Sequence, residues 1–208
     1  IDIVKNVVDH SLFENFDPFD SYGGVGDKFD SQSGYIVVLQ HPVTTEYNDA
    51  SFQIEQTLLA IQKINYPTFW FWPNVDAGSD KISKSIRNHR ENKDLENVYF
   101  LKNISPEDFI KLMVNAKCLV GNSSAGIREC SYIGTPVVNI GNRQSGREKG
   151  LNVIDSEYDY SKILKSTEKQ MSNDRYPQNN LYGDGYAGIK ISKLLEEQSP
   201  SIYKKLSY

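Results

Sequence analysis

The sequence predicts an α/β fold, a Rossmann-like doubly wound parallel sheet, and three observations predict it. Short apolar runs alternate with amphipathic runs along most of the 208 residues. The apolar runs are β-branched or aromatic and barely alternate with polar residues, which is typical of strands buried on both faces of a parallel sheet. Each strand-helix-strand repeat needs only a right-handed crossover, the usual connection in such sheets.

The bulk composition indicates a globular domain with a real core. Hydrophobic residues make up 38% of the chain and charged residues 24%, and the formal net charge is −4. Because no long basic run is present, we expect no nucleic-acid partner. Since no apolar stretch approaches the roughly 18 residues of a membrane span and no signal peptide is visible, we expect a cytoplasmic protein without a membrane partner.

The cysteines and histidines do not indicate a metal site. Cys118 and Cys130 are the two cysteines, and they resemble small buried hydrophobic residues of a reducing compartment. The three histidines, His10, His41 and His89, lie far apart without metal-ligand spacing. We therefore expect neither a metal nor a cofactor.

The first 34 residues are expected to lead into the sheet or connect it to another domain. Ile3, Val4, Val7 and Val8 lie at helical spacing in residues 1–10. Residues 11–34 mix Phe, Asp and Gly, which predicts an irregular segment whose aromatic side chains cover part of the core. The chain begins with Ile rather than Met, which we interpret as a sign of a fragment of a longer protein, with processing of the N-terminus as the alternative.

The Rossmann-like domain is expected over residues 35–197, with a polar tail over 198–208. Strand runs such as YIVVLQH end at proline or polar turn residues, and helical runs such as SFQIEQTLLAIQKIN carry one apolar stripe. Ser105 followed by Pro106 predicts a capped helix start. The predicted strands are 35–41, 68–72, 98–101, 117–120, 136–140 and 152–155. The predicted helices are 51–65, 81–94, 105–116, one short helix after 123, 158–173 and 185–197.

The last predicted helix, 185–197, is amphipathic. Ala187, Ile191, Leu194 and Leu195 recur at helical spacing and are expected to form its buried stripe. We therefore expect this helix to pack against the domain.

Candidate functional residues follow the strand ends. His41, Asn74, Ile104, Ser123 and Arg143 each come just after a predicted strand. Because the carboxyl ends of parallel strands share one edge of the sheet, where open α/β sheets bind ligands, we expect a crevice there. Asp76 fits a ligand contact and a helix cap equally well.

The stretch from Lys117 to Gly150 carries most of the chemistry. A hydroxyl of Ser123 or Ser124 can cap the next helix, whose free N–H groups suit a phosphate. Glu129 can accept hydrogen bonds from two sugar hydroxyls, and Arg143 offers planar charged donors for phosphate. The alternative is an ordinary strand-helix-strand unit with solvated charges, since neither GxGxxG nor GxxxxGK[ST] is present.

The same stretch carries a resemblance. GNSSAGIRE followed by GTPVVNIGNRQSGRE is similar to the hydrolysing branch of the UDP-N-acetylglucosamine 2-epimerase family, as are QHPVTTE, PNVDAGS and YGDG. The resemblance spans roughly residues 35–197. It implies the C-terminal half of a two-domain GT-B-type fold, a missing N-terminal domain that carries the acid/base carboxylates, and a homodimer as one assembly. The fragment alone is then expected to be inactive.

The resemblance implies an enzyme of amino-sugar or sialic acid biosynthesis that converts UDP-N-acetylglucosamine and water to UDP and N-acetylmannosamine. His41 and Arg143 would stabilise the leaving diphosphate. The other implied UDP contacts are Asn74, Ile104, Ser123, Ser124 and Glu129, while Arg128 and Arg147 fit a structural role equally well. The alternatives are a 2-epimerase of another UDP-amino sugar, a GT-B glycosyltransferase, and a non-catalytic nucleotide-sugar-binding module.

Overall fold

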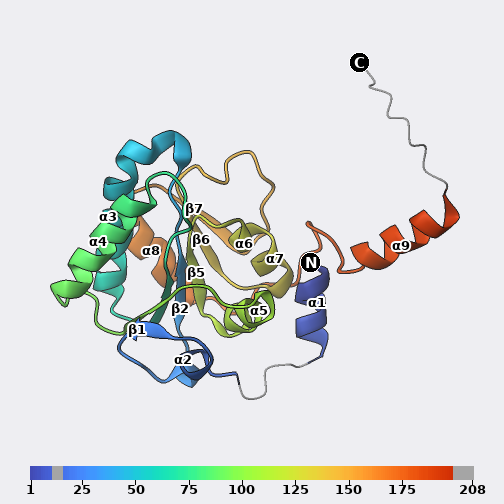
Figure 1. Cartoon of the computed structure of the whole chain (residues 1–208), viewed down its shortest axis with the longest axis horizontal. Helices are drawn as coiled ribbons and strands as arrows, with labels where there is room; N and C mark the ends of the chain where they lie inside the picture. Colours follow the sequence, from blue (N-terminus) through green and yellow to red (C-terminus); the bar gives the residue numbers. More distant parts are fainter. Residues whose placement is uncertain (11–15, 199–208) are drawn as a thin grey trace.

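A seven-stranded sheet forms the centre of the molecule (Figure 1). The computed structural model describes residues 1–10 and 16–198. The strand order is β1-β4-β3-β2-β5-β6-β7. Without β1, this is the 3-2-1-4-5-6 order of a Rossmann sheet, with its switch point between β2 and β5. The strands are β1 (Gly24–Gly26), β2 (Ile36–Leu39), β3 (Thr68–Phe71), β4 (Val98–Leu101), β5 (Cys118–Gly121), β6 (Val137–Ile140) and β7 (Val153–Ser156).

All six predicted strands are confirmed and pair in parallel. Val37 of β2 is in register with Phe69 of β3 on one side and Leu119 of β5 on the other. The sequence did not predict β1, which pairs antiparallel with β4 at the sheet edge. β1 has only three residues, Gly-Val-Gly, and therefore lacks the apolar run that indicates a strand.

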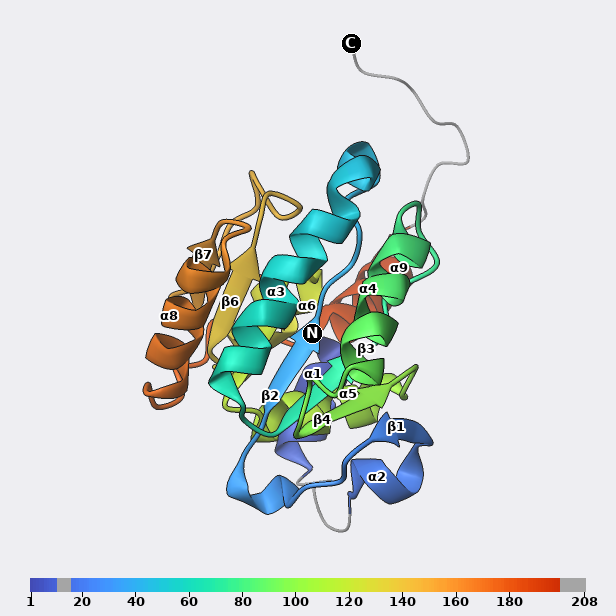
Figure 2. The ribbon, with the colours of Figure 1, turned by 90° about the vertical axis from the view of Figure 1, so that its left-hand side faces the viewer.

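Helices cover both faces of the sheet, as a doubly wound fold requires. Figure 2 shows α3 (Ala50–Ile64), α4 (Ser79–Glu91) and α8 (Tyr160–Met171) in front of the sheet. The short helices α6 (Ser124–Ile127) and α7 (Glu129–Ile133) and the longer α5 (Pro106–Asn115) lie on the other face (Figure 1).

Alternate strand residues supply the two hydrophobic cores. Trp70 packs in the core with Ile54 of α3, while its neighbour Phe69 packs with Leu112 of α5. Successive side chains of a strand point to opposite faces, so an apolar run fills both layers.

The lead-in segment, residues 1–34, covers the edge of the core that contains Phe69 and Leu112. It contains α1 (Asp2–Asp9), α2 (Pro18–Ser21) and a 3-10 turn, η1 (Ser31–Ser33). The ring centroids of Phe19 and Phe29 lie 5.1 and 4.8 Å from that of Phe69. The prediction that these aromatic side chains cover the core is therefore confirmed for the described residues, and residues 11–15 of the segment lie outside them.

The helix ends agree with the sequence at Ser105 and differ at Arg128. The Asp108 N–H donates to Ser105 Oγ at 3.1 Å, and Pro106 is the first residue of α5, as predicted. The single short helix predicted after residue 123 is instead two helices. Arg128, which separates them, stays in the right-handed helical region but with angles distorted from the ideal values (φ −103°, ψ −73°), and α7 begins at Glu129.

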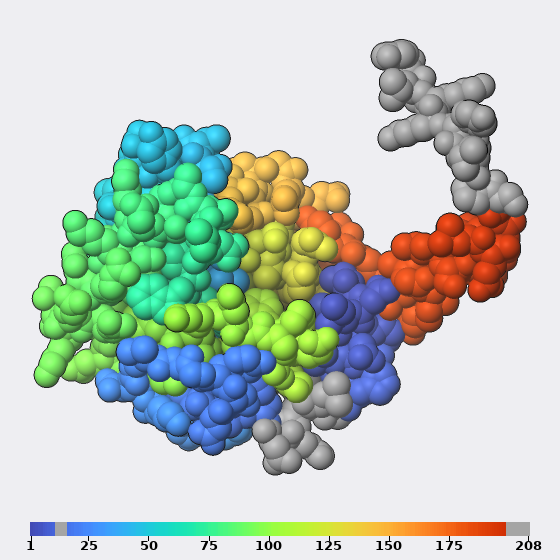
Figure 3. Space-filling view, viewed as in Figure 1, coloured from blue at the N-terminus to red at the C-terminus, as the bar shows by residue number. Residues whose placement is uncertain are grey.

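The predicted buried stripe of α9 (Ala187–Glu197) is wrong. Ile191, Leu194 and Leu195 are 56%, 52% and 63% exposed. The helix projects away from the body of the molecule (Figures 1 and 3). Among the described residues, Asp2 holds its first turn, because the carboxylate of Asp2 accepts hydrogen bonds from the N–H groups of Ala187 and Gly188. Amphipathic spacing predicts that a helix has an apolar face, but it does not say what covers that face.

Candidate functional site

The candidate site lies at the switch point, where the chain leaves β2 and β5 in opposite directions. Leu39 and Gly121 are the last paired residues of these two strands. Gly121 has φ +144°, and a Cβ there would lie 2.1 Å from the Leu39 carbonyl oxygen. Only glycine fits this conformation at this distance. It therefore allows the two turns that follow to run side by side.

Asn122 joins those two turns. Its Oδ1 accepts from the His41 N–H at 2.8 Å, and its Nδ2 donates to the His41 carbonyl at 2.8 Å. The residue is fully buried. Asn122 was not predicted as a site residue, because in the sequence Gly121-Asn122 marks only the end of an apolar run. One signal could have identified it: Asn122 is an amide side chain just after a predicted strand, as His41 is the last residue of another.

His41 is buried in the crevice as a neutral ring. Its Nδ1 accepts from the Asn74 N–H at 3.3 Å, so the proton of the neutral ring is on Nε2. Burial, and next the nearby Arg143 cation, lower the pKa of His41 to about 4, although the Asp76 carboxylate opposes this. At neutral pH His41 therefore offers an uncharged N–H donor.

Arg143 and Gln144 bring the loop after β6 to the same point. Arg143 Nη1 donates to the Asn122 carbonyl at 3.3 Å, and Gln144 Nε2 donates to the same oxygen at 2.8 Å. Gln144 is buried, whereas Arg143 lines an open hollow of about 550 Å³ together with Thr44 and Asp76. The loop is thus fixed by its buried amide and presents its cation to the crevice.

The serines and Glu129 lie on the next two short helices. Ser123 is the cap of α6, and its Oγ accepts from the Ala125 N–H at 3.3 Å, which settles which of the two serines is the cap. Ser124 and Glu129 open α6 and α7 and are half-buried. A Cβ on Gly126 would lie 2.9 Å from a methyl group of Val137, so this glycine lets α6 pack closely on β6.

Asn74 and Ile104 lie on the flank of the site, beyond β3 and β4. Asn74 is exposed and shares a hollow of about 370 Å³ with Trp72 and Lys102. Ile104 is half-buried against the core that contains Leu112. Direct hydrogen bonds therefore join His41, Asn74, Arg143 and the unpredicted Asn122, while the structure places the remaining predicted residues along the same sheet edge.

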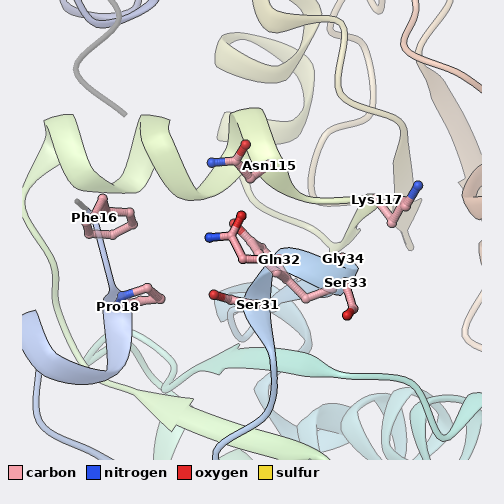
Figure 4. A pocket seen from close by; sticks show the side chains of 9 residues that line it. Phe16, Pro18, Ser31, Gln32, Ser33, Gly34, Asn115 and Lys117 are labelled. Carbon is pink, nitrogen blue, oxygen red and sulfur yellow. The ribbon is translucent and has the colours of Figure 1, made fainter. Parts of the chain in front are cut away.

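A separate hollow of about 240 Å³ lies at the other end of the sheet (Figure 4). It is lined by Tyr35 and Lys117, which directly precede β2 and β5, and contains none of the predicted site residues. Within residues 1–10 and 16–198, no group of three His, Cys, Asp or Glu side chains is placed to hold a metal ion. None of the helices in this described part is long and apolar enough to cross a membrane.

These features define the class as a doubly wound α/β domain with a polar crevice at its switch point. The family model for UDP-N-acetylglucosamine 2-epimerase matches residues 7–196. The chain therefore belongs to the UDP-N-acetylglucosamine 2-epimerase family, as its motifs predicted.

Two curated relatives agree with this assignment. The chain is 30% identical to a Legionella pneumophila UDP-N,N'-diacetylbacillosamine 2-epimerase (hydrolyzing), over 81% of this chain and 44% of the relative. It is 29% identical to a Neisseria meningitidis UDP-N-acetylglucosamine 2-epimerase, over 78% of this chain and 42% of the relative. The chain thus spans less than half the length of these relatives.

The solved structure supports the fold. The UDP-GlcNAc 2-epimerase of Methanocaldococcus jannaschii, in complex with UDP-GlcNAc and UDP, has a TM-score of 0.67 to this chain. The match covers 95% of this chain and 53% of that one at 15% identity. The predicted α/β fold of the GT-B kind is confirmed.

Proposed function

We propose that this chain is the UDP-binding half of a hydrolysing 2-epimerase of a UDP-amino sugar. The observation that carries the proposal is the hydrogen-bonded group of His41, Asn122 and Arg143 at the switch point, next to the serines that open α6. In doubly wound sheets this is the place where nucleotides bind.

The diphosphate would be held by Arg143, His41, Ser123 and Ser124. Arg143 supplies planar charged donors, and His41 adds its neutral Nε2–H. Ser123 Oγ accepts a backbone N–H, so its own O–H is free to donate outward. As the bond from sugar to diphosphate breaks, negative charge grows on the phosphate, and these fixed donors would stabilise it.

The nucleoside would lie along the neighbouring turns. Glu129, at the start of α7, would accept hydrogen bonds from the two ribose hydroxyls. Asn74 and Ile104 would line the uracil and ribose side. Arg128 and Arg147 are both exposed, which agrees with either a ligand contact or a solvated charge.

The reaction would convert UDP-N-acetylglucosamine and water to UDP and N-acetylmannosamine. Anti elimination of UDP gives a 2-acetamidoglucal, and syn addition of water gives the epimeric free sugar. The carboxylates that move these protons would belong to the part of the relatives that this chain does not span. This chain by itself would then bind the nucleotide without turnover.

A second substrate fits the same site. The Legionella relative is named for UDP-N,N'-diacetylbacillosamine, and its identity to this chain is close to that of the Neisseria enzyme named for UDP-N-acetylglucosamine. Both substrates carry the same UDP group, so a site that holds UDP serves either sugar. Sugar-product analysis of the longer protein with each substrate separates them.

Calorimetric titration of UDP into this chain tests the proposal, with UMP and UDP-N-acetylglucosamine in parallel. We expect UDP to bind, UMP to bind more weakly because it lacks one phosphate, and the sugar to add little. Absence of UDP binding, both here and with the longer protein, would refute the proposal.

The alternative functions are tested by turnover in the longer protein. A glycosyltransferase would give no free N-acetylmannosamine without an acceptor, and a non-catalytic binding module would give no turnover in the longer protein.

A further inference from the structure

Asn122 is the point where three loops of the crevice are joined. Its N–H donates to the Leu39 carbonyl at 3.2 Å, and its side chain makes the two 2.8 Å bonds to the His41 backbone. Its carbonyl accepts from both Arg143 and Gln144. Every polar group of this fully buried residue is therefore engaged, and the partners come from the segments that follow β2 and β6.

The two side-chain bonds replace a missing strand pairing. Regular pairing of β2 with β5 ends at Leu39 and Gly121. One residue further on, the Asn122 carboxamide bonds to both the N–H and the C=O of His41, as a neighbouring strand would. A carboxamide offers a donor and an acceptor on one short planar group. Asp would lack the donor, and Ser would be too short to reach both atoms.

The main-chain carbonyl of Asn122 fixes the loop after β6, which carries Arg143. Two donors converge on the Asn122 carbonyl, and one of them, Gln144, is only 1% exposed. Buried amides of this kind are costly to leave unpaired. The loop after β6 is therefore held against Asn122 while Arg143 remains at the hollow with Thr44 and Asp76.

We propose that Asn122 is the positioning residue that sets His41 and Arg143 relative to each other, so that both donors are in place before a diphosphate arrives. Asn122 itself need not touch the ligand. The identity of that ligand rests on the proposed function, but the positioning of His41 does not.

Asn152 provides a matched control. It is also a buried asparagine with two side-chain bonds, from Ser131 Oγ at 2.9 Å and to the Thr135 carbonyl at 2.9 Å. Its side-chain bonds involve neither His41 nor Arg143. Asn122→Ala and Asn152→Ala therefore each remove two side-chain bonds, but only the first variant loses bonds to His41. The bonds from Arg143 and Gln144 to the main-chain carbonyl of residue 122 remain available in Asn122→Ala.

The experiment has two readouts, NMR titration of the His41 ring and calorimetry with UDP. In Asn122→Ala we expect the His41 midpoint to rise from about 4 toward the ordinary 6.5 by at least about one pH unit, because the released ring gains water. UDP affinity should fall about tenfold or more. In Asn152→Ala the midpoint should stay in place, and UDP affinity should change by less than about twofold.

The outcomes distinguish the positioning role of Asn122 from the proposed function of the chain. If the two variants shift the His41 midpoint equally, or if neither shifts it, the positioning role is overturned whatever UDP does. If the wild-type chain and the longer protein bind no UDP, the proposed function fails, and the midpoint still decides the role of Asn122. Should Asn122→Ala not fold, Asn122→Ser is measured instead, because its shorter side chain loses at least one of the two bonds to His41.

Discussion

The ring of His41 stays neutral because its burial and the adjacent Arg143 cation both oppose protonation. In the neutral ring, Nδ1 accepts the Asn74 N–H, which fixes the proton on Nε2. In the proposed site, an uncharged donor beside a cation would let both groups approach one phosphate without repelling each other. At the residue scale, the chemistry of the crevice therefore depends on the environment of the side chains as much as on their type.

His41 should make stability depend on pH. Its pKa in the folded chain is about 4, below the ordinary 6.5. The unfolded chain therefore binds more protons between these values, so stability falls as pH drops from 6.5 to 4. His41→Asn keeps an acceptor for the Asn74 N–H and should remove on the order of 3 kcal/mol of this pH-dependent change. Denaturant unfolding at pH 7 and pH 4.5 measures it.

The control for this measurement is His10→Asn, since His10 is an exposed histidine directly after α1. This variant should keep the pH dependence of the wild type. An unchanged pH dependence in His41→Asn would contradict the assigned neutral state.

Glu129 should matter for binding rather than for folding. If its carboxylate accepts the two ribose hydroxyls, Glu129→Ala weakens UDP binding by about 1–3 kcal/mol. Glu107 is a matched control, because it lies in the first turn of α5 as Glu129 lies in that of α7. Glu107→Ala should leave UDP affinity unchanged. Calorimetry on the three proteins decides, and equal affinities would remove the ribose role of Glu129.

The element that organises the site is the turn from β5 into α6. Gly121 brings this turn against the end of β2, and Gly126 seats α6 on β6. The distorted angles at Arg128 then separate α6 from α7, so that Glu129 begins a new first turn. Two glycines and one distorted helix junction thus set the positions of the serines and the glutamate after β5.

Gly121→Ala should destabilise the chain by at least about 2 kcal/mol, because the added Cβ needs a left-handed backbone and meets a main-chain oxygen. Gly23→Ala is the control, since a Cβ there has no atom within 4 Å. Thermal and denaturant unfolding of both variants test this. A tolerated Gly121→Ala would show that the turns after β2 and β5 can separate without cost.

At the scale of the whole molecule, one open seven-stranded sheet is covered by helices on both faces, and the outward part of α9 lies apart from it. The six parallel strands bring loops far apart in sequence to one edge. In contrast, α9 leaves the body with its apolar residues exposed (Figure 3). The stability of the described domain should therefore come from the sheet and its two helical layers.

A pair of leucine variants tests this division. Leu195 on α9 is 63% exposed, whereas Leu58 on α3 is fully buried. Leu195→Ala should change the free energy of unfolding by less than about 0.5 kcal/mol, and Leu58→Ala should cost about 2–5 kcal/mol. A large loss in Leu195→Ala would mean that α9 packs against the domain in solution.

The sequence by itself determined the six parallel strands and the sheet edge at which His41 and Arg143 lie. An apolar run that is buried on both faces of the sheet is a local signal in the sequence. His41 and Arg143 come at or just after the ends of two such runs, so their place at the same edge of the sheet could be predicted. The role of each predicted site residue stays a prediction. β1 was missed because three residues carry no periodic signal.

Only the tertiary structure decided the features that depend on partners distant in sequence. Asn122 meets His41 across 81 positions, so no local pattern marks it. The low pKa of His41 arises from burial and from Arg143, which the fold brings in from another loop. The apolar stripe of α9 could be predicted from the sequence, but its exposure to solvent could not. Periodicity indicates which residues share a face of a helix, whereas tertiary packing decides whether that face is covered.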